Sequence, residues 1–81
     1  MNLQHMKYAV AVAETGSINK AADRLFVGQS NLSRAIKELE NSLGVAIFER
    51  SAHGMELTPE GGVFLRYAKA ILHQVDEVEH M

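Results

Sequence analysis

The chain has 81 residues, no cysteine, 8 basic and 10 acidic side chains, and a formal net charge of −2. This length fits one small domain, 47% hydrophobic residues are typical of a folded protein, and the lack of cysteine excludes disulfides and thiolate metal sites. No apolar run reaches the roughly 18 residues of a membrane span, and Met1 to Lys7 does not have the pattern of a secretory signal. A negative net charge counts against nucleic-acid binding, so any surface that binds DNA has to be a local one.

Charge is unevenly distributed along the chain. Residues 51–81 carry two basic and five acidic side chains, whereas residues 20–50 carry five basic and four acidic ones. The stretch from Phe26 to Lys37 contains Arg34 and Lys37 and no acidic residue. We therefore expect any contact with DNA phosphates or bases to include this stretch.

Two helices are predicted before residue 28. Apolar residues recur at steps of three and four in a first helix that Gly16 ends, and these residues are Leu3, Met6, Val10 and Ala13. Ser17 is a good N-cap for a second, short helix, whose apolar side chains are Ala21, Ala22, Leu25 and Phe26. Gly28 follows, and a glycine suits a tight turn because it adopts backbone conformations that other residues avoid. The alternative is that Gly28 serves as a weak N-cap for the next helix.

A third helix is predicted from about Gln29 to Ser42, ended by Gly44. Its apolar residues follow steps of four, three and four, and they are Leu32, Ile36, Leu39 and Leu43. The opposite face is polar and carries Ser30, Ser33, Arg34, Lys37 and Asn41. Such a helix is expected to pack on a core with one face and to leave the polar face in solvent.

The remaining chain predicts a β-hairpin and one long helix. Val45–Arg50 and Met55–Thr58 are short apolar runs that flank the glycine-containing turn Ser51–Gly54. Thr58 and Pro59 form a typical helix start, and the helix continues to about Met81. Its heptad-like seam, a candidate dimerisation surface, consists of Phe64, Ala68, Ile71, Val75 and Val78. The alternative is that this seam packs against the chain's own domain.

Two short helices joined by a tight turn, with a polar face on the second, are typical of a helix-turn-helix. The small side chains of Ala21 and Ala22 allow the two helices to cross closely, and the second helix can lie in the major groove of DNA. Its candidate DNA-binding residues can reach phosphates or base edges, and they are Gln29, Ser30, Asn31, Ser33, Arg34 and Lys37. Arginine is suited to guanine, and asparagine or glutamine to adenine.

The same segments resemble the LysR-type transcriptional regulators. The resemblance rests on Ala13–Leu25, Gln29–Arg34, Leu39–Val45, Ile47–Arg50 and Leu57–Gly61, in order and without gaps. It implies a mainly α-helical fold, a winged helix-turn-helix with three helices and a short β-hairpin wing, followed by a long dimerisation helix. It also implies that residues 1–58 form the DNA-binding domain and residues 59–81 the linker helix.

Further expectations follow from the resemblance. The protein is expected to bind an inverted-repeat site on double-stranded DNA as a homodimer in the bacterial cytoplasm, with tetramers and a small-molecule effector depending on a C-terminal domain absent from this chain. In the wing, Arg50 and His53 are candidate DNA-binding residues, although a more basic residue is common near His53. Other departures are Gly28, where many members have serine, and Asn31, where a small apolar residue is frequent.

The alternatives concern individual residues and the function as a whole. Arg50 could simply pair with Glu49 or Glu56. The scattered histidines show no metal-ligand spacing, and no nucleophile–base pattern or phosphate-binding loop is present, so we expect no metal, no cofactor and no enzyme. A winged-helix module that binds proteins rather than DNA stays open, because the net charge is negative.

Overall fold

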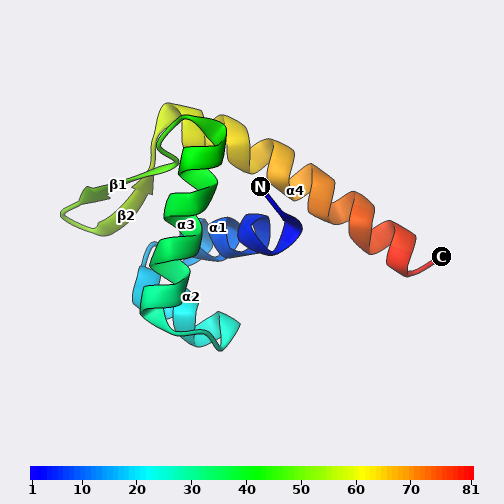
Figure 1. The fold of residues 1–81 in the computed structure, drawn as a ribbon, viewed down its shortest axis with the longest axis horizontal. Coiled ribbons are helices and arrows are strands. Elements are labelled where there is room, and N and C mark those ends of the chain that lie inside the picture. The colour runs from blue at the N-terminus through cyan, green and yellow to red at the C-terminus, as the bar shows by residue number, and fades with distance from the viewer.

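The computed structural model describes residues 1–81 and contains four α-helices and one two-stranded antiparallel sheet (Figure 1). In chain order the elements are α1 (Leu3–Thr15), α2 (Ile18–Leu25), α3 (Gln29–Leu43), β1 (Phe48–Ser51), β2 (Gly54–Leu57) and α4 (Pro59–Glu79). This order confirms the predicted fold class, a mainly α-helical winged helix-turn-helix followed by a long helix. None of the four helices combines the length and the apolar composition needed to cross a membrane.

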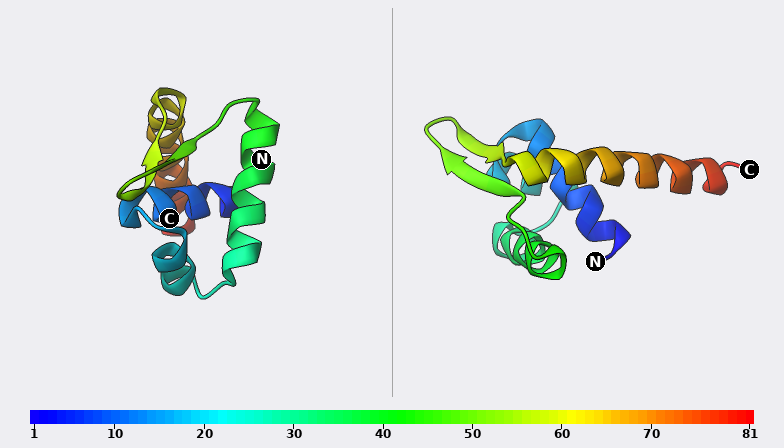
Figure 2. Two further views of the ribbon diagram at one scale, coloured as in Figure 1. Left: turned by 90° about the vertical axis from the view of Figure 1, so that its left-hand side faces the viewer. Right: turned by 90° about the horizontal axis from the view of Figure 1, so that it is seen from above.

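Helix α1 lies at the centre of the molecule. It contacts α2, α3, α4 and strand β2, so it is covered on more than one side (Figure 2). Its buried residues are Met6, Ala9, Ala11 and Val12. The predicted stripe was therefore only partly right: Leu3 is exposed and Val10 and Ala13 are half-buried. A single-stripe pattern describes a helix buried on one face, and α1 is buried on two.

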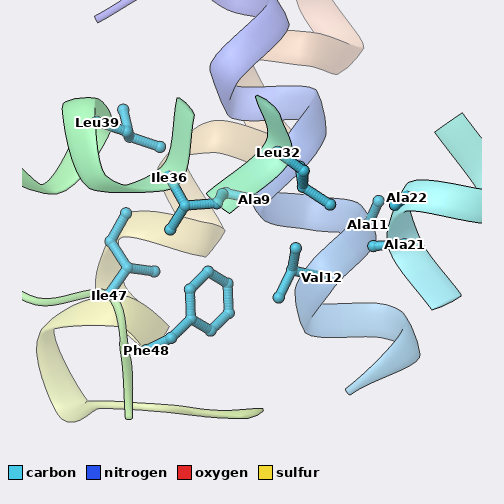
Figure 3. Packing of buried hydrophobic residues seen from close by; sticks show 10 residues of the cluster. All are labelled: Ala9, Ala11, Val12, Ala21, Ala22, Leu32, Ile36, Leu39, Ile47 and Phe48. Carbon is cyan, nitrogen blue, oxygen red and sulfur yellow. The ribbon is translucent and has the colours of Figure 1, made fainter. Parts of the chain in front are cut away.

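The hydrophobic core forms where α3 and the start of β1 pack onto α1. Leu32, Ile36 and Leu39 project from α3 toward the α1 side, and Ile47 and Phe48 approach from the hairpin (Figure 3). Ala21 and Ala22 of α2 are also buried in this cluster, as expected for small residues at a helix crossing. The apolar pattern predicted for α3 is confirmed at Leu32, Ile36 and Leu39, while Leu43 is half-buried and Ala35 is an additional buried residue.

In the turn between α2 and α3, Gly28 takes the N-cap role expected as an alternative, but the special backbone conformation expected of a glycine lies elsewhere. Gly28 has an ordinary extended conformation, φ −72°, and serves as the N-cap of α3, whereas the left-handed residue is Phe26, φ 58°. Backbone N–H groups of Phe26 and Val27 donate to the carbonyls of Asp23 and Ala22, at 3.3 and 3.1 Å. These paired bonds end α2 in the Schellman arrangement, whose left-handed position is usually glycine. Phe26 is 95% exposed, so its assignment to the apolar stripe of the second helix is wrong.

The hairpin wing is attached to the α1–α2 turn by its backbone. Met55 N–H donates to the carbonyl oxygen of Gly16 at 3.0 Å, and Gly54 has φ 120°. A Cβ on Gly54 would collide with the Gly16 carbonyl oxygen, so this close approach requires glycine. The wing therefore has a defined position beside the start of α2.

Helix α4 starts at the predicted cap and then leaves the domain. The Thr58 hydroxyl accepts a hydrogen bond from Gly61 N–H at 2.9 Å and donates to the Ala46 carbonyl at 2.6 Å, and Pro59 occupies the first turn. Gly61 is buried against the backbone of Ile47. The C-terminal half of α4 extends past the other elements, at the opposite end of the molecule from the wing (Figures 1 and 2).

Candidate nucleic-acid interface

The polar face of α3 is exposed along its whole length. Every candidate on this helix is exposed, namely Gln29, Ser30, Asn31, Ser33, Arg34 and Lys37. The first N–H groups of a helix have no intrahelical partner, and the N-cap Gly28 offers no side chain to bond them. The positive end of the helix dipole and these free donors favour an anion at this end of α3.

A polar groove lies between α3 and the wing. It has a volume of about 480 Å³, and Gln29 and Ser33 of α3 face Arg50 and His53 of the hairpin across it. None of its 12 lining residues is acidic, although the chain as a whole carries a net charge of −2. An adjoining hollow of about 230 Å³ shares Ser33 and Arg50 and adds Lys37 together with the acidic Glu40, whose carboxylate accepts from the N–H groups of Ile47 and Phe48. The fold thus gathers five of the eight candidate DNA-binding residues around one surface.

The same groove includes residues that sequence reasoning did not select for DNA contact. The α1–α2 connection contributes Thr15, Ser17, Asn19 and Lys20 to its lining. Ser17 was recognised only as the cap of α2, and its hydroxyl does accept from Lys20 N–H at 3.2 Å. No local pattern marks this connection as part of the site, because it lies beside the wing through long-range contacts such as the Met55–Gly16 hydrogen bond.

The remaining three candidates lie outside this groove. Ser30, Asn31 and Arg34 are exposed on α3 but do not line it. The Arg34 guanidinium donates a hydrogen bond from Nη2 to Oδ1 of Asn31. These side chains therefore form a second part of the α3 surface, separate from the part that faces the wing.

The basic residues near the groove are not neutralised by ion pairs. Arg50 lies opposite Met55 in the hairpin register and forms no ion pair, so the alternative pairing with Glu49 or Glu56 is not adopted. Lys20, Lys37 and Arg34 also have no carboxylate within ion-pair distance. In contrast, Arg24 of α2 pairs with Glu14 of α1 at 2.8 Å. Four unpaired basic side chains thus lie on α3, the start of α2 and the wing, and the other three, Lys7, Arg66 and Lys69, lie on α1 and α4.

The predicted dimerisation seam is divided between two environments. Ala68 is 0% exposed and Phe64 packs against the core, because the first half of α4 lies on α1. At Ala68 the seam therefore packs against the chain's own domain, as the alternative expected. Ile71 and Val78 are 38% and 65% exposed and, with the half-buried Val75, line an apolar hollow near the C-terminal end.

Two further exposed apolar residues lie on the outer side of α4. Tyr67 is 66% exposed and Val63 is also exposed, and neither belonged to the predicted seam. At 100° per residue, Val63, Tyr67, Ile71 and Val78 fall within one quarter of the helix circumference. We call these four residues the outer strip of α4.

Comparison with known proteins assigns this chain to a family. The profile described as "Bacterial regulatory helix-turn-helix protein, lysR family" matches residues 3–62. The chain belongs to the LysR family. This confirms the resemblance found in its sequence motifs.

Individual relatives match all or most of this LysR-family chain. It is 44% identical over 81 residues to the HTH-type transcriptional regulator BenM of Acinetobacter baylyi, with 100% of the chain and 27% of BenM covered. It is 45% identical over 73 residues to the HTH-type transcriptional regulator ClcR of Pseudomonas putida, with 90% of the chain and 25% of ClcR covered. The chain thus spans about a quarter of the length of these relatives.

Solved structures match the fold closely. A BenM_DBD complex with benA site 1 DNA superposes with a TM-score of 0.95 at 44% identity, covering 100% of this chain and 94% of that one. A CbnR_DBD–DNA complex superposes with a TM-score of 0.93 at 41% identity, covering 99% and 92% of the two chains. These are DNA complexes of similar proteins that carry a domain of the same fold.

Proposed function

We propose that this chain is the sequence-specific DNA-binding domain of a LysR-type transcriptional regulator and has no enzymatic activity of its own. The observation that carries the proposal is the groove between α3 and the wing, which lacks acidic residues and has Lys20 and Arg50 in its lining. A protein with an acidic total needs such a local basic surface to bind a polyanion. The BenM_DBD and CbnR_DBD complexes with DNA support this proposal.

In the proposed complex, α3 lies in the major groove and the wing contacts the DNA backbone. Arg34 reads a base edge, with guanine as the base that its planar donors fit best. Gln29, Ser30 and Ser33, near the start of α3, contact bases or the phosphate at the helix N-terminus, where the dipole is favourable. The other phosphate contacts come from Lys20, Lys37, Arg50 and His53. The last two belong to the wing.

We further propose that residues 1–58 form the DNA-binding unit and residues 59–81 a linker helix that forms a homodimer. The apolar outer strip of α4 remains between 38% and 66% exposed in the single chain, and its C-terminal part extends beyond the other elements. Two chains joined along this strip are related by a twofold axis, which places two α3 helices on an inverted-repeat site. In a longer protein of the bacterial cytoplasm, an effector-binding domain would add tetramer formation and a response to a small molecule.

Selection of bound duplexes from a random DNA pool tests this proposal. The selected sequence is expected to be an inverted repeat, and binding to it is expected to weaken steeply as the salt concentration rises, because phosphate contacts release counterions. Equal binding to selected and random DNA would contradict sequence-specific recognition. Absence of binding at low salt would instead favour the winged-helix protein-interaction module.

A further inference from the structure

Arg34 is not free on the exposed face of α3, because it has a hydrogen-bond partner one turn earlier. Its Nη2 donates to Oδ1 of Asn31, and both side chains are exposed. Residues three apart on a helix lie on the same face, so the bond forms without distortion of the backbone. It is the only hydrogen bond between two side chains of α3.

The other end of the Asn31 amide is directed toward the start of the helix. A Cβ placed on Gly28 would lie 3.8 Å from Nδ2 of Asn31, an ordinary van der Waals contact. An asparagine that reads adenine presents its oxygen and nitrogen together to one base edge. In this chain the oxygen faces Arg34 and the nitrogen lies near Gly28, so the amide is arranged along the helix.

We propose that Asn31 is a positioning residue that acts through Arg34 and does not read a base itself. This inference rests on the proposed DNA-binding function and deepens it. The hydrogen bond engages one of the five N–H donors of the guanidinium and leaves the others free for a base edge. Asn31 thereby sets the plane of the guanidinium before DNA arrives.

The benefit of such positioning is a smaller loss of side-chain freedom on binding. An arginine loses much of its rotamer freedom when it is immobilised at an interface, and a partner that already orders it removes part of that cost. The gain for the base that Arg34 contacts corresponds to about two- to tenfold in affinity. This gain in affinity is specific to the base pair that Arg34 contacts, because the oriented N–H donors of Arg34 do not match the edges of other bases.

A double-mutant cycle on the complete chain distinguishes positioning from direct reading. The probe is the duplex selected by the wild-type chain, with every base pair substituted in turn, and the variants are Asn31→Ala, Arg34→Ala and the double variant. Asn31→Ala is expected to weaken preference two- to tenfold at the same base pair that Arg34→Ala affects. In the Arg34→Ala background it is expected to have no further effect. Asn41→Ala, an exposed asparagine about two turns beyond Arg34 on α3, is the matched control and should not change the preference at the base pair of Arg34.

Other outcomes contradict the inference. If Asn31→Ala relaxes preference at a different base pair, or if the two losses add, Asn31 reads a base directly. If Asn31→Ala leaves the base preference unchanged at every position of the DNA site, Asn31 has no role in recognition.

A measurement on the free protein separates this inference from the proposed function. Nitrogen-15 relaxation of Arg34 Nε is expected to report faster motion in Asn31→Ala, while Asn31→Asp, which keeps the acceptor, retains the wild-type motion. Unchanged motion in Asn31→Ala overturns the positioning role alone. A wild-type chain that binds no DNA overturns the proposed function, whatever the motion of Arg34.

Discussion

Two adjacent glycines at the start of α4 predict opposite effects of the same substitution. A Cβ on Gly61 would lie 2.8 Å from the carbonyl carbon and 3.0 Å from the Cα of Ile47, and it would overlap the carbonyl oxygen. A Cβ on Gly62 meets no atom within 4 Å. Since both residues are helical, alanine gains about 1 kcal/mol of helix propensity at either position.

At Gly61 this gain is outweighed by the collision. Overpacking costs about 1–3 kcal/mol, and displacement of α4 also weakens the Thr58 cap on Gly61 N–H, worth about 1 kcal/mol. We expect Gly61→Ala to destabilise the domain by about 1–3 kcal/mol. Gly62→Ala, the matched control, should stabilise it by about 0.5–1 kcal/mol.

Urea unfolding followed by far-ultraviolet circular dichroism measures this difference. The free energies of unfolding of the two variants should differ by about 1.5–4 kcal/mol, which corresponds to about 5–30 °C in Tm for a domain of this size. Each variant is compared at several protein concentrations, because dimer formation also raises apparent stability. If Gly61→Ala is as stable as Gly62→Ala, α4 does not pack this closely on Ile47 and the reasoning is refuted.

Three predictions concern DNA binding and assembly. Arg34→Ala should cost about 1–3 kcal/mol in titrations of the selected DNA, and unchanged affinity for both selected and random DNA would remove Arg34 from the interface. Arg50→Ala should lose footprint protection flanking the centre of the site, whereas Glu49→Ala should retain it; full protection in both variants would exclude a wing contact. Ile71→Glu should leave the fold intact but abolish the dimer in analytical ultracentrifugation, and Lys69→Glu, on the opposite side of α4, should not. A wild-type chain that sediments as a monomer at high concentration would exclude α4 as a dimerisation helix.

Much of the fold could be predicted because several elements bury a single face. Helix α3 was expected from about Gln29 to Ser42 and extends from Gln29 to Leu43. Its apolar residues recur with the helical period, and a glycine stands just beyond each end. The start of α4 could also be predicted, because the Thr58 cap and Pro59 both act within the first turn of the helix.

Predictions failed where a local pattern had more than one physical explanation. A glycine in the turn suggested the left-handed position, but the paired backbone bonds that end α2 place that conformation on Phe26. The apolar residues of α4 recur at steps of three and four. This spacing predicts an apolar face but does not identify the segment that covers it. Helix α1 covers Ala68, so the face left exposed is the outer strip.

The amino-acid sequence by itself determined the order of the elements and the polar face of α3, because these depend on local propensity and periodicity, and its motifs indicated the family by resemblance. Only the tertiary structure brought Lys20 of α2, Ser33 of α3 and Arg50 of the wing around one groove. That arrangement depends on the Met55–Gly16 hydrogen bond and on packing between segments distant in sequence. Such long-range contacts have no period along the chain, so they become visible only when the chain is folded.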